Sequence, residues 1–278
     1  MYKFAVLPYV NASPLVHFLP EVCPGSKLIY LTPGKTLSEL TAGRVDAAIV
    51  PVVDYLDTPE LDIIENLGIC ADGKVESVLL QCQCPLDEVK IVNLDPASKT
   101  SNLLVKLLLK KHFCVRQEIQ FRYGAINADA CVMIGDRALS AERSFESYDL
   151  AAEWKRMTGL PFVFAVWVCR ANRKDKQELS EILHAAKKAG CKAINRLSKL
   201  YAKKVGLTEA RCRHYLTSSL HYDLGPKEKN SMKLFHELYT SLIQNRGQTI
   251  KEESIQTRRI VPNERKSHSI EAVGPRFR

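Results

Sequence analysis

The segments YVNASPL (residues 9–15) and NLDPASKTSNLL (residues 93–104) decide the fold, because each joins an apolar strand to a helix through a polar turn. The strand KFAVL precedes the first segment and VKIVNL runs into the second, and each turn carries Asn, Ser or Thr with Pro at or near it. Such a junction leaves the first N–H groups of the helix without intrahelical partners, which creates an anion-binding site. One turn in each half of the chain predicts two lobes that face each other across a cleft suited to a small carboxylate.

Strands and helices alternate outward from both turns. The first third is expected to read strand, helix, strand, helix, strand, as KFAVL, SPLVHFL, KLIYL, TLSELTAGR and DAAIVPV. After the β-rich segment VESVLLQCQC, a second round is expected to comprise VKIVNL, TSNLLVKLLLKKHF, EIQFRY, ACVMIG, DLAAEWKRMTG and the fully apolar strand PFVFAVWVC. This alternation predicts an α/β protein with parallel sheets covered by helices, followed by a helical region that extends to about residue 245.

The order of these elements predicts that the chain crosses twice between lobes. We expect a discontinuous lobe I, residues 1–88 with 171–245, enclosing lobe II, residues 89–170. The crossings are expected near residues 78–90 and 163–170. The polar, basic segment 246–278 lacks apolar periodicity, so we expect it to be disordered.

Composition is typical of a soluble globular protein, with 46% hydrophobic and 26% charged residues among 278. No apolar run reaches the roughly 18 residues of a membrane span, and MYKFAVLPYV does not resemble a secretory signal, so we expect a cytoplasmic protein without a membrane partner. The nine cysteines form no CxxC pair. We therefore expect reduced thiols and no metal site.

The formal charge of +9 is concentrated in two places. Residues 173–204 hold ten Lys or Arg against three acidic residues, and the segment from Arg246 onward holds eight against four. Neither has the interleaved aromatic residues of a nucleic-acid-binding module, so no nucleic-acid partner is expected. A solvated basic helix face accounts for the charge, and attraction of an anionic metabolite is the functional alternative.

Polar residues at the expected strand exits of lobe I are candidate ligand groups, because ligands of α/β sheets bind beyond the carboxyl ends of strands. Asn11 offers an amide that both donates and accepts hydrogen bonds. Ser13 is a candidate for substrate binding, although helix capping alone explains it. Ser77 interrupts the apolar run VESVLL beside a glycine loop, where it either contacts a ligand or bonds to neighbouring backbone.

The corresponding candidates in lobe II are Ser98, Thr100 and Ser101, which surround an expected helix start. Capping needs only one of these hydroxyls, so the others are available to an anion. Asp136, after Gly135 in MIGDRAL, is a further candidate for substrate binding and is equally well explained as a helix cap. The chain contains no GxSxG, Walker, GxGxxG or HExxH motif. Catalysis by this chain would therefore rely on hydroxyls, amides and backbone dipoles.

Six ordered segments together resemble the chorismate dehydratases of menaquinone biosynthesis by the futalosine route. They are YVNASPL, LTAGRVDAAIVPVVDYL, GKVESVLL, LDPASKTSNLLVKLLL, MIGDRAL and AAEWKRMTGLPFVFAVWVCR. The resemblance implies a type II periplasmic-binding-protein-like fold and removal of water from chorismate to give 3-[(1-carboxyvinyl)oxy]benzoate without a cofactor. It further implies that Asn11 and Ser77 lie closest to the chemistry and that the hydroxyls at 98–101 hold a carboxylate. The substrate's own enolpyruvyl carboxylate is expected to remove the ring proton.

The chain departs from the family pattern at Val52, where many relatives carry Ser, and at Arg137, where a small residue is usual. Two other functions compete with the dehydratase. The first is the sister enzyme that makes 1,4-dihydroxy-6-naphthoate, in which a histidine of lobe II is expected to act as the base. Residues 113–183 of this chain contain no histidine, which disfavours this function. A non-catalytic binding protein for small carboxylates is the second alternative, which the absence of an export signal disfavours. Oligomeric state does not follow from the sequence.

Overall fold

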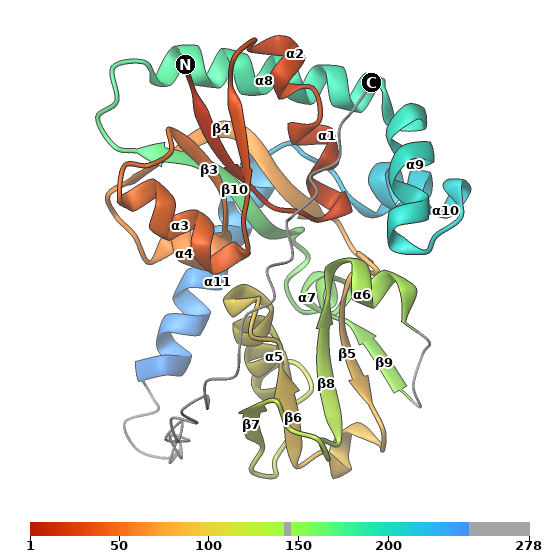
Figure 1. Cartoon of the computed structure of the whole chain (residues 1–278). Helices are drawn as coiled ribbons and strands as arrows, with labels where there is room; N and C mark the ends of the chain where they lie inside the picture. Colours follow the sequence, from red (N-terminus) through yellow and green to blue (C-terminus); the bar gives the residue numbers. More distant parts are fainter. Residues whose placement is uncertain (142–145, 245–278) are drawn as a thin grey trace, which may run out of the picture.

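The computed structural model describes residues 1–141 and 146–244, which form two lobes, each built on a five-stranded sheet (Figure 1). The sheet of lobe I has the order β2-β1-β3-β10-β4 and comprises Lys3–Val6 (β1), Lys27–Tyr30 (β2), Ala47–Pro51 (β3), Leu61–Ala71 (β4) and Phe162–Arg170 (β10). The sheet of lobe II has the order β7-β6-β8-β5-β9 and comprises Val78–Cys82 (β5), Ile91–Leu94 (β6), Gln120–Tyr123 (β7), Ala130–Ile134 (β8) and Glu146–Asp149 (β9). The expected disorder of 246–278 concerns residues outside these ranges.

Three parallel strands form one side of each sheet. Strand β1 pairs in parallel with β2 and β3, and β6 pairs in parallel with β7 and β8. The remaining strands run antiparallel: β10 between β3 and β4, and β5 between β8 and β9. The α/β architecture predicted from alternating strands and helices is therefore confirmed.

The sheets divide the chain at other positions than the expected lobe boundaries 88/89 and 170/171. Strand β5 belongs to the second sheet, although it was expected in lobe I, and β10 belongs to the first sheet, although it was expected in lobe II. Strand β10 is apolar and almost entirely buried, so it needs neighbours on both sides, which β3 and β4 supply. The chain leaves lobe I through β4 and returns to it through β10. These two crossing strands pair directly, with Ala71 opposite Phe162 and Cys70 opposite Val163.

The helices follow the predicted positions, with some shorter than expected. In place of the expected helix at 13–19, the chain forms two short helices, α1 (Ser13–Val16) and α2 (Leu19–Val22), preceded by the 3₁₀ turn η1 (Val10–Ala12). The other helices and turns are α3 (Pro33–Thr41), α4 (Val52–Leu56), η2 (Leu86–Glu88), α5 (Lys99–Lys111), α6 (Gly135–Ser140), α7 (Leu150–Thr158), α8 (Lys176–Lys192), α9 (Ile194–Ala202), η3 (Lys203–Val205), α10 (Glu209–His214), the π-helix η4 (Tyr215–Ser219) and α11 (Pro226–Gln244). Within the described ranges, none combines the length and apolar character needed to cross a bilayer.

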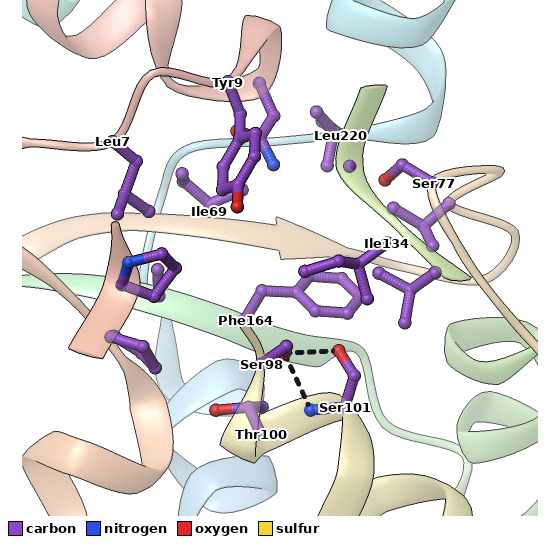
Figure 2. A pocket seen from close by; sticks show the side chains of 17 residues that line it. Leu7, Tyr9, Ile69, Ser77, Ser98, Thr100, Ser101, Ile134, Phe164 and Leu220 are labelled. Atoms are coloured by element: carbon purple, nitrogen blue, oxygen red, sulfur yellow. Dashed lines mark hydrogen bonds between the residues drawn. The ribbon is translucent and has the colours of Figure 1, made fainter. Parts of the chain in front are cut away.

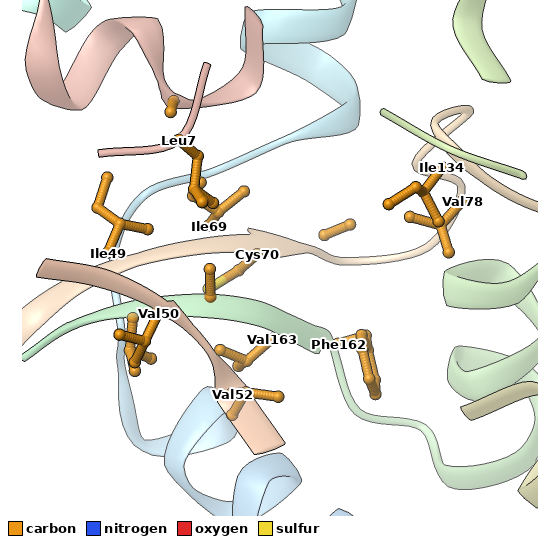
Figure 3. Close-up of a cluster of buried hydrophobic side chains, with 14 of the residues drawn as sticks. Leu7, Ile49, Val50, Val52, Ile69, Cys70, Val78, Ile134, Phe162 and Val163 are labelled. Atoms are coloured by element: carbon orange, nitrogen blue, oxygen red, sulfur yellow. The ribbon is translucent and has the colours of Figure 1, made fainter. Parts of the chain in front are cut away.

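A buried apolar cluster follows the crossing strands from one lobe into the other. Ile49, Ile69 and Val163 lie on neighbouring strands of the first sheet, and Val78 and Ile134 continue the cluster into the second sheet (Figure 3). Helix α11 packs against β10 and against α5, so it contacts both lobes. The crossing strands and α11 together hold the two sheets in a defined arrangement.

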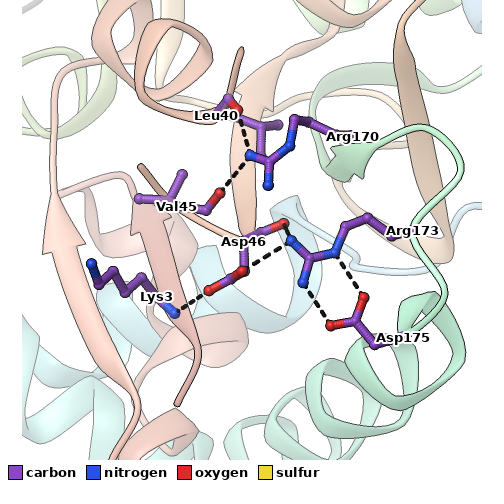
Figure 4. Close-up of polar contacts among 7 residues, drawn as sticks. All are labelled: Lys3, Leu40, Val45, Asp46, Arg170, Arg173 and Asp175. Atoms are coloured by element: carbon purple, nitrogen blue, oxygen red, sulfur yellow. Dashed lines mark hydrogen bonds and ion pairs between the residues drawn. The ribbon is translucent and has the colours of Figure 1, made fainter. Parts of the chain in front are cut away.

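An arginine cluster fixes β10 at the end remote from the cleft (Figure 4). The Arg170 guanidinium donates to the carbonyl oxygens of Leu40 and Val45, at 2.8 and 3.0 Å. Arg173 forms ion pairs with Asp46 and Asp175. Because β10 runs antiparallel to β3, these contacts lie at the amino end of β3, and its carboxyl end is left free to face the cleft.

The close contact between α8 and α1 makes Gly190 a sensitive position. A Cβ at residue 190 would lie 1.9 Å from the Pro14 carbonyl oxygen, which belongs to backbone and cannot rotate away. Gly190→Ala is therefore expected to destabilise the protein by about 1–3 kcal/mol, despite the better helix propensity of Ala. Gly34→Ala in α3 is the control, because nothing lies within 4 Å of its Cβ position.

Chemical denaturation of both variants measures this effect. We expect Gly190→Ala to lower the denaturation midpoint and Gly34→Ala to leave it unchanged or raise it slightly. A Gly190→Ala variant as stable as the wild type would show that α1 and α8 do not approach as closely as described.

Candidate functional site

A pocket lies between the lobes, and residues of both lobes and of the paired crossing strands line it (Figure 2). The empty space at this position is about 580 Å³, a figure that includes the part open to solvent. Five of the seven residues expected from the sequence line it: Asn11, Ser77, Ser98, Thr100 and Ser101. Apolar side chains supply the rest of the wall, including Phe164 from β10 and Ile134 from the end of β8.

The start of α5 supplies the hydroxyls on the lobe II side. Ser98 caps the helix, since its Oγ accepts a hydrogen bond from the Ser101 amide at 3.1 Å. The same Ser98 hydroxyl donates to Ser101 Oγ at 2.8 Å, as the dashed lines in Figure 2 show. Ser101 Oγ thus accepts a bond and keeps its own hydrogen for another acceptor. The positive end of the helix dipole favours an anion here.

Thr100 connects this helix start to lobe I. Its Oγ1 accepts a bond from the Val53 amide in α4 at 3.4 Å, and the side chain is buried. Because the oxygen serves as acceptor, the hydroxyl hydrogen of Thr100 can point to a ligand. Nearby, Lys99 forms an ion pair with Asp57, the residue that follows α4, so its charge is already partnered.

Ser77 is held at the crossing between β4 and β5. Asp149, the cap of α7, accepts bonds from the amides of Val75 and Glu76, and this clamp fixes the two residues before Ser77. Glu76 has φ of 67°, a left-handed conformation that costs free energy in a residue other than glycine. The Ser77 Oγ accepts a bond from the Tyr215 hydroxyl at 2.8 Å. Strained backbone held by a carboxylate therefore places the Ser77 hydroxyl at the pocket.

Asn11 occupies the 3₁₀ turn after β1. Its Oδ1 is buried, and the described residues offer it no hydrogen-bond partner. A buried amide oxygen without a donor is rare in native proteins, because it costs free energy that a bond would recover. Since Asn11 lines the pocket, a ligand that donates a hydrogen bond would satisfy this oxygen.

Tyr9 closes the pocket against lobe II. A Cβ at residue 135 would lie 3.2 Å from the Tyr9 ring, and Gly135 has φ of 59°, so glycine suits the position on both counts. Burial raises the pKa of the Tyr9 hydroxyl, and the carboxylates of Asp95 and Asp136 add to the effect. Tyr9 is the one ionisable side chain among the described lining residues, and it is neutral at physiological pH.

Two of the expected site residues do not line the pocket. The Ser13 hydroxyl donates to the Val10 carbonyl oxygen at 2.7 Å, a local bond within the turn. Asp136 accepts a bond from the Val10 amide at 3.3 Å, and burial raises the pKa of this carboxyl. Both bonds hold the turn that carries Asn11, and the expected contact of Ser13 and Asp136 with substrate stays a prediction. Arg137 forms an ion pair with the buried Asp95, which occupies its charge.

Several residues that line the pocket or contact its lining were not expected from the sequence. Tyr9 directly precedes the expected strand exit, and its position in YVNASPL was a usable signal. Tyr215 lies far along the chain, and nothing local indicates its contact with Ser77. Phe164 is part of an apolar run in which no residue stands out. No group of three or more His, Cys, Asp or Glu residues suited to a metal ion occurs within residues 1–141 and 146–244.

Comparison with known proteins places this site in a family. A family model described as menaquinone biosynthesis matches residues 2–241. The chain belongs to the menaquinone biosynthesis family. A chorismate dehydratase from Campylobacter jejuni is 30% identical over 240 residues, covering 84% of this chain and 95% of the relative. A chorismate dehydratase from Thermus thermophilus is 27% identical over 259 residues, covering 85% of this chain and 94% of the relative.

Solved structures support the fold of this menaquinone biosynthesis family member. The periplasmic aliphatic sulphonate binding protein of Escherichia coli superimposes with a TM-score of 0.61, over 88% of this chain and 92% of that one, at 16% identity. At this low sequence identity, the structural similarity supports the fold alone. The expected periplasmic-binding-protein-like fold with two α/β lobes is confirmed.

Proposed function

We propose that this protein is a chorismate dehydratase, which removes water from chorismate to give 3-[(1-carboxyvinyl)oxy]benzoate. The observation that carries the proposal is the chemistry of the pocket: both lobes present neutral hydroxyl or amide groups, and the described lining residues include no ionised side chain. Family membership and the two related chorismate dehydratases support it. The expectations of a cytoplasmic location, no cofactor and no nucleic-acid partner remain predictions.

Neutral donors suit this reaction because the substrate supplies most of the driving force. The ring loses a hydroxyl group and the hydrogen on the neighbouring carbon. The electron pair of the broken C–H bond enters the ring, hydroxide leaves, and the ring becomes aromatic. The protein then has to fix the geometry, exclude water and stabilise developing charge.

The residues on each side of the pocket have a separate role in this proposal. Thr100, Ser101 and the first amides of α5 bind one substrate carboxylate, because two hydroxyl hydrogens and the helix dipole meet there. Ser77 donates to the leaving hydroxyl, and Asn11 accepts a hydrogen bond from the substrate through its unpartnered oxygen. The substrate's enolpyruvyl carboxylate takes the ring proton, since no described lining residue is suited to act as base.

The neutral lining predicts a flat pH profile. Tyr9 stays protonated well beyond neutral pH because its pKa is raised, so kcat/KM is expected to vary less than about two-fold between roughly pH 6.5 and 9. A histidine base would instead produce an ascending limb near its usual pKa of about 6.5. Activity should decline on the acid side, where Asp136, whose pKa burial raises, gains a proton and weakens its bond to Val10. Initial rates in buffers of constant ionic strength measure this profile.

The proposal is tested by mixing the purified, metal-stripped protein with chorismate. We expect a product 18 mass units lighter than chorismate, with the ultraviolet spectrum of a substituted benzoate. Binding of chorismate without turnover would overturn the dehydratase proposal and favour a binding protein. Turnover that disappears on chelation and returns with added metal would overturn the cofactor-free mechanism.

A further inference from the structure

We infer that Tyr215 is a positioning residue that orients the Ser77 hydroxyl, an assignment that rests on the proposed dehydratase function. The Tyr215 hydroxyl donates to Ser77 Oγ at 2.8 Å, although the two residues lie 138 positions apart. Tyr215 is fully buried, and its ring belongs to the core rather than to the pocket wall. A side-chain hydrogen bond also joins Tyr215 to Asn11. Tyr215 therefore acts on a substrate through residues that line the pocket, above all Ser77.

The π-helix η4 explains how Tyr215 reaches this position. It follows α10 without interruption and spans Tyr215–Ser219, and a π-helix often marks a functional site. Its two ends contact consecutive residues of the crossing segment: Tyr215 contacts Ser77, and the Ser219 hydroxyl donates to Glu76 at 3.1 Å. The η4 segment thus bonds to the side chains of the strained crossing, whose backbone amides are bound by Asp149.

Direction is the important property of the Tyr215 bond. A serine hydroxyl has one hydrogen and accepts through its lone pairs. When Tyr215 donates to Ser77 Oγ, the Ser77 hydrogen has to point elsewhere, and the pocket is the open side. Burial raises the pKa of the Tyr215 phenol, so it remains a donor throughout the working pH range. Tyr215 therefore turns Ser77 from a freely rotating hydroxyl into an oriented donor.

Tyr215→Phe tests this assignment, because it removes only the hydroxyl. We expect kcat for chorismate to fall about ten-fold, as for the loss of one oriented hydrogen bond, with KM changed less than about two-fold. Tyr222→Phe is the matched control: Tyr222 is also buried in lobe I, and the described residues offer its hydroxyl no partner. It is expected to retain wild-type kcat.

A double mutant separates positioning from general loosening of the pocket. If Tyr215 acts mainly through Ser77, Tyr215→Phe lowers the residual turnover of Ser77→Ala, measured with enzyme in excess over chorismate, much less than it lowers wild-type turnover, and the remaining effect reflects its bond to Asn11. Full activity of Tyr215→Phe, an additive loss in the double mutant, or an equal loss in Tyr222→Phe would each overturn the assignment. A wild-type protein that does not turn over chorismate would instead contradict the proposed function itself.

Discussion

Replacing Ser77 with alanine is expected to lower kcat for chorismate by about 10²- to 10³-fold, the usual cost of removing one oriented donor to developing charge. The hydroxyl receives a bond from Tyr215 and is held by the Asp149 clamp on the preceding amides, so its position is fixed before substrate arrives. In the variant, a water molecule would have to take the place of the Ser77 hydroxyl, and it would not be held in the same orientation. Steady-state kinetics with chorismate measure the loss.

The control for Ser77→Ala is Ser38→Ala. Ser38 lies on α3, where its exposed hydroxyl bonds to the Lys35 carbonyl oxygen, so its removal should leave kcat unchanged. Circular dichroism should show that both variants are folded. A folded Ser77→Ala protein with wild-type turnover would remove Ser77 from the proposed chemistry.

Asn11→Ala has the second largest expected effect, and it should separate activity from stability. The unpartnered Oδ1 destabilises the unliganded protein, whereas the side-chain hydrogen bond between Asn11 and Tyr215 stabilises it, so removing the amide is expected to change the melting temperature little. Turnover should nevertheless fall by about 10²-fold, because the substrate loses a positioned partner. Thermal unfolding and kinetics on the same preparation measure both quantities.

Asn195→Ala serves as the control for this position, since Asn195 is exposed on α9 and is expected to change neither property. A marked fall in the melting temperature of Asn11→Ala would show that the amide is structural. A variant with full turnover would show that the buried oxygen has another purpose.

The parts predicted from the sequence are those set by local chemistry. The helix start at 98–101 follows from one capping serine with two further hydroxyls, and the structure places all three at the pocket. Asn11 and Ser77 were recognisable because each is a polar side chain beside an apolar strand. Such signals depend only on neighbours in the sequence.

Local signals alone do not separate residues that line the pocket from residues that bond to nearby backbone. Ser13 and Asp136 have the same residue types and positions as true pocket residues, yet both bond to Val10, because a hydroxyl or carboxylate at a turn serves backbone groups equally well. Strand β4 was missed because it contains a bulge opposite β10, where Asn66 has φ of 60°, and the bulge breaks the two-residue alternation. Without β4, the lobe to which β10 belongs was assigned wrongly.

The remaining part of the site depends on tertiary contacts. The bond from Tyr215 to Ser77 and the contact of Tyr9 with Gly135 join segments more than 100 residues apart. Neither leaves a pattern in the local sequence. They depend on how the C-terminal helices and lobe II pack against the turn after β1.

The most direct test of the central claim is a crystal structure of the Ser77→Ala protein with chorismate bound. We predict one carboxylate within about 3.2 Å of the Thr100 and Ser101 hydroxyls, and the ring hydroxyl directed toward Asn11 and the space left by the Ser77 side chain. Chorismate bound outside the pocket between the lobes, or with both carboxylates directed away from the start of α5, would contradict the account.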